Sequence, residues 1–163
     1  MAGLADGESR VVTSPLGPIT LRLPAGAHLS RDPGVVEGTQ LWWDAFSVSF
    51  GAQEGWSADS FLDLERSASG RLLVENDDAI DVGDGVSVRE LRLTVESEVA
   101  RHWSSDQAGR HEEPARVERE RLRFRFWSFG DHVVSAGYRM PDGDPKRQAL
   151  LDSVLDSVRV GGS

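Results

Sequence analysis

Arginine recurs at every second position in one stretch of the sequence, which contains Arg119, Arg121, Arg123 and Arg125. Side chains two residues apart lie on the same face of a β-strand, so the spacing predicts a row of guanidinium groups along one face. A guanidinium group stays charged and can form two parallel hydrogen bonds with a carboxylate. We therefore predict that this row binds an anionic partner surface. The alternative is that the row pairs across the sheet with glutamates of residues 92–98.

Two tryptophans share the polar face of their strands and extend this surface. The alternation of polar and apolar residues places Trp43 on the same face as Ser47, and Trp127 on the face of the arginine row. Large aromatic side chains are enriched in protein interfaces, where they carry much of the binding energy. The predicted binding residues are Arg119, Arg121, Arg123, Arg125, Trp43 and Trp127. The alternative is that a helix or a loop of the same chain covers both indole rings.

Histidines and acidic residues gather in two stretches, but neither has the spacing of a known metal site. His102, His111, Glu112 and Glu113 fall within one polar stretch, and their spacing matches no zinc motif. The acidic run 77–84 lacks the glycine and glutamate positions of an EF-hand loop. We interpret the first stretch as a solvated loop and the second as turn chemistry. The sequence therefore predicts no metal ion and no cofactor.

Motifs of common catalytic sites are missing from the sequence. There is no cysteine, so no thiolate can act as a nucleophile. No Gly-x-Ser-x-Gly motif is present, and Gly83-Asp84-Gly85 lacks the following glycine and lysine of a phosphate-binding loop. We predict that the protein is not an enzyme. A hydrolase whose catalytic groups come from distant segments is the alternative.

Length and charge narrow the choice of class and partner. A chain of 163 residues predicts a single domain over 1–163, with a flexible tail at 1–9. The net charge of −9 disfavours binding to nucleic acid. No run approaches the roughly 20 apolar residues of a membrane span. The first residues lack the basic and apolar regions of a signal peptide, so we predict a cytoplasmic protein.

Residues Val117 to Met140 predict two long strands joined by a tight turn at Phe129-Gly130-Asp131. Three large apolar side chains, Leu122, Phe124 and Phe126, alternate with the arginine row. Their burial would contribute about 1.5–3 kcal/mol each. An isolated hairpin is marginal in water, so other strands must join it to form a sheet that is packed on this Leu/Phe face.

The remaining elements are predicted from periodicity and from capping residues. Further strands are expected at 10–13, 19–23, 41–50, 71–75 and 86–99. Turns are expected at 76–78 and 83–85, a loop at 27–40, and an exposed loop or long hairpin tip at 104–116. A first helix begins after Ser57 as N-cap and ends near Gly70. A last helix begins after Asp144, with Pro145 at its first position. It carries an apolar stripe, and we expect it to pack on the apolar face of the sheet.

Three segments together carry a resemblance to a known family. They are the strand 19–23 closed by Pro24-Ala25-Gly26, the helix start at 57–62, and the apolar helix at 150–159. In this combination the chain resembles the PsbP-like fold superfamily, and within it the small bacterial DcrB-like domains, over residues 19–160. The resemblance implies an α+β fold with a single antiparallel sheet of about six strands packed with helices.

The resemblance also implies a role in protein binding. PsbP-like relatives include photosystem accessory subunits, a Ran-binding import factor and chaperones of type VI secretion effectors. We therefore expect a non-enzymatic adaptor or secretion chaperone whose partner is another protein: a secreted effector, a toxin or an assembly component. The alternatives are an immunity-type inhibitor of a toxin, and a small-ligand carrier that uses a pocket between sheet and helix.

Overall fold

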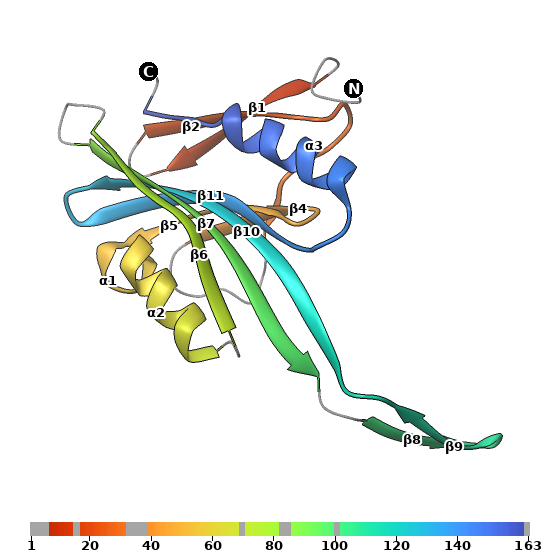
Figure 1. The fold of residues 1–163 in the computed structure, drawn as a ribbon. Helices are drawn as coiled ribbons and strands as arrows, with labels where there is room; N and C mark the ends of the chain where they lie inside the picture. Colours follow the sequence, from red (N-terminus) through yellow and green to blue (C-terminus); the bar gives the residue numbers. More distant parts are fainter. Residues whose placement is uncertain are drawn as a thin grey trace.

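The computed structural model describes residues 7–14, 17–31, 39–68, 71–81, 86–99 and 102–161, in which strands predominate (Figure 1). The elements are β1 (Glu8–Ser14), β2 (Gly17–Leu23), β3 (Ser30–Arg31), β4 (Thr39–Trp43), β5 (Phe46–Ala52), α1 (Gln53–Trp56), α2 (Ala58–Ala68), β6 (Arg71–Asp81), β7 (Val86–Val99), β8 (His102–Asp106), β9 (Gly109–Glu113), β10 (Arg116–Phe129), β11 (His132–Pro141), α3 (Pro145–Asp156) and β12 (Arg159–Val160).

The strands form more than one sheet. Seven strands make a large antiparallel sheet in the order β3-β4-β5-β11-β10-β7-β6, and β1-β2-β12 and β8-β9 form two smaller sheets. The predicted α+β fold with a single sheet of about six strands is therefore wrong. Strands make up 63% of the structure and helices 20%, so the chain is mostly β.

The stretch 41–50 explains part of this difference. The sequence predicts one strand there, whereas the structure has β4 and β5 joined by a tight turn, with Trp43 paired with Phe46. Asp44 in this turn has a φ of 51°, in the left-handed region that Asp tolerates better than most residues. The turn gives the large sheet an additional strand. It also changes which residues of the stretch share a face.

The long hairpin at the centre of the sheet is confirmed. β10 and β11 pair in antiparallel register from Glu120 and Pro141 to Phe129 and His132, which leaves Gly130 and Asp131 as the turn. β7 pairs with β10 along its whole length, and β5 pairs with the other side of β11. Most of the large sheet is therefore built around this hairpin.

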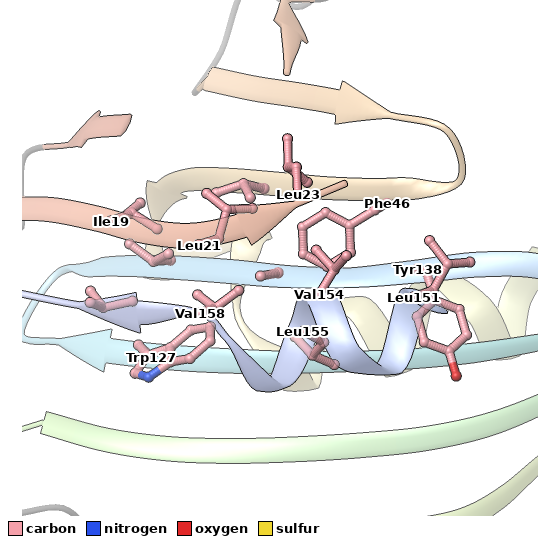
Figure 2. Packing of buried hydrophobic residues seen from close by; sticks show 14 of the residues in the cluster. Ile19, Leu21, Leu23, Phe46, Trp127, Tyr138, Leu151, Val154, Leu155 and Val158 are labelled. Carbon is pink, nitrogen blue, oxygen red and sulfur yellow. The ribbon is translucent and has the colours of Figure 1, made fainter. Parts of the chain in front are cut away.

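One face of the large sheet is covered by α3 and the three-stranded sheet. Figure 2 shows side chains of β2 and α3 packed against large residues of β5, β10 and β11. The labelled members of this core are Ile19, Leu21, Leu23, Phe46, Trp127, Tyr138, Leu151, Val154, Leu155 and Val158. Helix α3 begins as predicted, since the Asp144 side chain accepts a hydrogen bond from the Arg147 N–H at 3.1 Å. This is the face that carries the arginine row, so α3 does not lie over the Leu/Phe face.

The opposite face, which carries the Leu/Phe side chains of β10, is covered by α2. Ser57 caps this helix, accepting a hydrogen bond from the Ser60 N–H at 3.2 Å. A second core lies between α2 and the sheet and contains Ala58, Leu62, Leu91, Leu93, Val95, Leu122, Phe126 and Val133. Each face of the large sheet therefore has its own hydrophobic core, under a different helix.

Other predicted features are longer than expected or lie outside the described residues. The strand predicted at 71–75 continues as β6 through the turn predicted at 76–78, with a register shift between Val74 and Asn76. The stretch 104–116 includes a hairpin tip, because β8 and β9 pair beyond the ends of β7 and β10 (Figure 1). Residues 1–6, Gly70 and the turn predicted at 83–85 lie outside the described residues.

Candidate functional site

The outer half of the arginine row is partly exposed and paired within the chain. Arg119 Nη2 lies 2.7 Å from Glu96 Oε1, across the β7–β10 ladder. Arg121 Nε lies 2.6 Å from Asp142 Oδ1, next to the end of β11. The hydrogen bond to Asp142 raises the pKa of Arg121 above its ordinary value. Both arginines thus have intramolecular carboxylate partners. The pair of Arg119 with Glu96 is the cross-strand pairing of the second interpretation, whereas Arg121 pairs with Asp142, outside residues 92–98.

The inner half of the row lies beneath α3. Arg123 is only 6% exposed, and its Nε lies 2.6 Å from Glu90 Oε1. Its two terminal nitrogens contact Asp152 at 3.0 Å and Asp156 at 2.9 Å, both on α3. Burial alone would lower the pKa of Arg123, but these hydrogen bonds and charges outweigh it and raise the pKa. Arg125 shares Glu90 and Asp156 at 3.4 and 3.5 Å. The row therefore connects α3 to the sheet.

The two predicted tryptophans do not lie on an open surface with the arginines. Trp127 is 8% exposed and belongs to the core beneath α3, as Figure 2 shows. Trp43 is partly buried and packs against the same core. The structure brings Arg123, Arg125 and Trp127 together on one side of β10, with the Arg125 guanidinium carbon 5.9 Å from the Trp127 ring centre. The partner-binding role of these residues stays a prediction.

The stretches considered for metal binding have other contacts. His111 Nε2 lies 3.0 Å from Asp106 Oδ1 on the β8–β9 hairpin. Asp77 pairs with Arg89 at 2.7 Å, and this hydrogen bond lowers the pKa of Asp77. Within the described ranges, no group of three or more His, Cys, Asp or Glu side chains is placed to hold a metal ion. Asp84 lies outside those ranges.

A pocket of about 360 Å³ lies between the helices α1 and α2 and the large sheet. Two rows of paired residues cross four neighbouring strands, β4, β5, β11 and β10, and form its floor. One row runs Gln40, Ser49, Ser135, Phe126, and the other runs Trp42, Ser47, Gly137, Phe124. Each row has small residues in the middle and a large residue at β10. The missing side-chain volume on β5 and β11 creates the hollow.

Aromatic rings form the walls of the pocket. Phe61 of α2 packs against Phe124 and Phe126, with ring centres 4.8 and 5.7 Å apart. Two glycines let rings lie directly on the sheet. A Cβ at Gly51 would lie 2.6 Å from the Trp56 ring, and a Cβ at Gly137 would lie 2.6 Å from the Phe124 ring. The walls are therefore apolar and closely packed on the backbone.

Three serines supply polar groups on the floor. Ser47 and Ser49 are 3% and 4% exposed, and Ser135 is half-buried beside them. None of the three hydroxyls forms a hydrogen bond with another described residue, and none is fully enclosed without a partner. Each hydroxyl can donate one hydrogen bond and accept others. The floor therefore offers hydrogen-bonding groups to a molecule that enters the hollow.

An ion cluster lies at one end of the pocket. Arg139, the ionisable residue among the described residues that line it, contacts Glu65 of α2 at 2.7 Å and Glu120 of β10 at 3.0 Å. Hydrogen bonding to Glu120 raises the pKa of Arg139, and the charge of Glu65 adds to this effect. The charge of Arg139 is thus already matched by two carboxylates.

Sequence reasoning missed this pocket, because it places Trp43, Ser47 and Ser49 on one strand face. The hairpin turn at Asp44 separates them, so that Trp43 packs in the core beneath α3 while Ser47 and Ser49 face α2. The signal in the sequence is the alternation of small residues in both β5 and β11, opposite a strand of alternating phenylalanines. This pattern indicates a pocket only when the order of the strands is known, because the order shows which residues are neighbours.

Comparison of the sequence with models of protein families and with curated proteins finds no match. The resemblance to the PsbP-like superfamily therefore stays a prediction. Among the described residues, no helix has both the length and the apolar character that a membrane crossing requires.

Proposed function

We propose that the protein binds a small, largely apolar molecule in the pocket between α2 and the sheet. The observation that carries this proposal is a floor of serine hydroxyls that have no hydrogen-bond partner among the described residues, lined by aromatic rings. Sites for small molecules are typically concave, mostly apolar and about 300–1,000 Å³, with a few polar groups that fix orientation. The pocket, at about 360 Å³, is at the small end of that range.

The energetics favour a ligand that combines apolar bulk with a polar group. An apolar body would contact the rings of Trp56, Phe61 and Phe124 and gain about 25 cal/mol for each Å² removed from water. A polar group at the floor would satisfy the hydroxyls of Ser49 and Ser135, which otherwise lose contact with water when the pocket fills. The hydrogen bonds of such a ligand replace those that the serine hydroxyls lose when water leaves the pocket.

A carrier or sensor fits the pocket better than an enzyme. The ionisable side chain among the described lining residues is Arg139, which is held by two carboxylates. General acid–base catalysis needs a group that exchanges protons near neutral pH, and an arginine is unsuited to that role. Among the alternatives raised by the sequence, the pocket supports the small-ligand carrier, with the cytoplasm as the location that the sequence predicts. The roles of adaptor, secretion chaperone and immunity protein stay predictions.

The proposal is tested with the uncharged dye N-phenyl-1-naphthylamine, whose emission rises in apolar surroundings. We expect saturable binding to the full chain. The variant Ser135→Leu fills the hollow from its centre and is expected to weaken binding by at least about tenfold, a loss of about 1.4 kcal/mol. Its additional buried carbon atoms are expected to raise the free energy of unfolding by about 1 kcal/mol.

The matched control is Ser87→Leu, the same substitution at an exposed position of β7. It should leave dye binding unchanged. If Ser135→Leu perturbs the circular dichroism spectrum, the smaller substitution Ser49→Val takes its place. Equal dye affinity in the wild type, a folded filling variant and the control would contradict the proposal, as would an absence of saturable binding to the wild type.

A further inference from the structure

We infer that the pocket selects uncharged ligands and rejects carboxylates of the same shape. This inference rests on the proposed function and names the chemical class of its ligand. It is carried by the ion cluster of Glu65, Glu120 and Arg139 at the end of the pocket. In that cluster Arg139 is already paired with two carboxylates, so the described lining of the pocket offers no unpaired positive charge.

The geometry of the cluster keeps Arg139 from serving as an anion-binding group. Its Nη1 lies 2.7 Å from Glu65 Oε1, and its Nη2 and Nε lie 3.0 and 3.2 Å from the two carboxylate oxygens of Glu120. The Glu65 side chain is only 7% exposed, so little water reaches it to replace the contact with Arg139. A ligand carboxylate would therefore have to compete with a buried glutamate for the same guanidinium.

The net charge of the ion cluster disfavours the binding of an anion in a second way. Two carboxylates and one guanidinium give the cluster a net charge of −1, and the whole chain carries a net charge of −9. A ligand carboxylate in the apolar hollow would lose its hydration and meet like charge. A ligand ammonium would also lose its hydration, while both nearby carboxylates are already engaged by Arg139. An uncharged ligand avoids both penalties.

The floor is suited to uncharged polar groups. The hydroxyls of Ser47, Ser49 and Ser135 can each donate and accept, so they complement an alcohol, a carbonyl or an amide. The aromatic wall formed by Phe61, Phe124 and Phe126 is suited to an aliphatic or aromatic body. The ligand class that follows is an uncharged apolar molecule with a single hydroxyl, carbonyl or amide group.

The test is displacement of N-phenyl-1-naphthylamine by 1-decanol, decanoate and decylamine, which share one chain and differ in charge. Measurements are made with the full chain at neutral pH and physiological ionic strength, where the Debye length is about 8 Å and long-range attraction is screened. We expect 1-decanol to displace the dye on the order of tenfold more effectively than decanoate or decylamine.

A charge variant tests the assigned cause. In Glu65→Gln/Glu120→Gln, Arg139 loses both carboxylates and becomes available to a ligand. The ratio of decanoate to decanol affinity is then expected to rise by on the order of tenfold. The control is Glu98→Gln/Glu118→Gln, which makes the same change in net charge at two exposed residues that do not line the pocket. If the double variant does not fold, Glu120→Gln alone should shift the ratio in the same direction.

The outcomes separate the two proposals. If the dye binds but decanoate or decylamine displaces it as well as 1-decanol, the charge selectivity is wrong and the ligand pocket stands. If the Glu65/Glu120 variant and its control change the decanoate-to-decanol ratio equally, the ion cluster is not the cause of selectivity. If neither the dye nor any of the three compounds binds, the proposed function and this inference both fail.

Discussion

Gly137 is a single residue on which the shape of the pocket depends. It lies between Ser47 and Phe124 in one floor row, and a Cβ added there would lie 2.1 Å from the Arg123 carbonyl oxygen and 2.6 Å from the Phe124 ring. Because backbone cannot yield easily, Gly137→Ala is expected to lower the free energy of unfolding by about 1–3 kcal/mol, measured by urea denaturation. It should also weaken dye binding, since the Phe124 ring must move.

The control for this substitution is Ser135→Ala, on the same strand and the same face. It removes a hydroxyl that has no described partner, so the free energy of unfolding should change by less than about 0.5 kcal/mol. If Gly137→Ala and Ser135→Ala change the free energy of unfolding equally, the close approach of Phe124 to the backbone at Gly137 does not contribute to stability.

Tyr138 is the only tyrosine of the chain, so its ionisation can be followed by ultraviolet absorbance without a contribution from another phenol. Burial, and then the hydrogen bond that its hydroxyl donates to Asp152 at 2.7 Å, raise its pKa above the ordinary 10.0. In the unfolded chain the phenol loses its proton first. Stability from this group is therefore fully present below pH 10.0 and falls as the pH rises above it.

We expect phenolate absorbance to appear only at a pH above that of free tyrosine, together with alkaline unfolding. In Tyr138→Phe, the free energy of unfolding should depend less on pH in this alkaline range. A phenolate signal with the midpoint of free tyrosine, in a chain that is still folded by circular dichroism, would contradict the buried position of Tyr138.

At the scale of elements, α3 is held to the sheet by a buried cation as well as by its apolar side. Arg123 contacts Glu90 of β7 and both Asp152 and Asp156 of α3. The substitution Arg123→Met removes the close 2.6 Å contact of the nearly buried Glu90 and leaves it the longer 3.4 Å contact with Arg125. We expect a loss of about 3 kcal/mol in the free energy of unfolding. Chemical denaturation measures this loss, and hydrogen exchange should show weaker protection in α3.

The matched substitution Arg121→Met is two residues away on the same strand face. Arg121 is 39% exposed, and among the described residues its close carboxylate contact is with Asp142, so its loss should lower stability by less than about 1 kcal/mol. If Arg123→Met and Arg121→Met lower the free energy of unfolding equally, the buried cluster stabilises the fold no more than a surface ion pair does.

The elements that sequence reasoning predicted well are specified by local signals. The alternation of Phe124 and Phe126 with arginines, and the turn at Gly130, define the β10–β11 hairpin within a few residues. The side chains of Ser57 and Asp144 define the starts of α2 and α3. The local sequence does not predict the turn at Asp44. An aspartate within an alternating stretch is equally compatible with a strand position and with a left-handed turn.

At the scale of the whole molecule, the candidate site was not predictable from local patterns. The arginines and Trp127 share one face of β10, as the alternation predicts, but the carboxylates of α3 that pair with Arg123 become its neighbours only in the folded chain. The pocket depends on the register of four strands. Two of them, β4 and β5, form a hairpin that the sequence pattern does not predict. Small residues such as Ser47 and Ser135 carry no signal alone, since serine is common on any exposed strand face.

The two-residue turn at Gly130 and Asp131 has a consequence for how the protein can vary. Successive side chains of β10 belong alternately to the pocket wall and to the cluster beneath α3, so Phe124 and Arg123 are adjacent in sequence but serve opposite sides. An insertion or deletion of one residue that shifts the pairing register of β10, and is not absorbed in the turn, would exchange the two sets of side chains and disrupt both sites at once. Related chains should therefore conserve the length of this loop more strictly than its composition, and changes on either side of β10 should be inherited as substitutions and not as length differences.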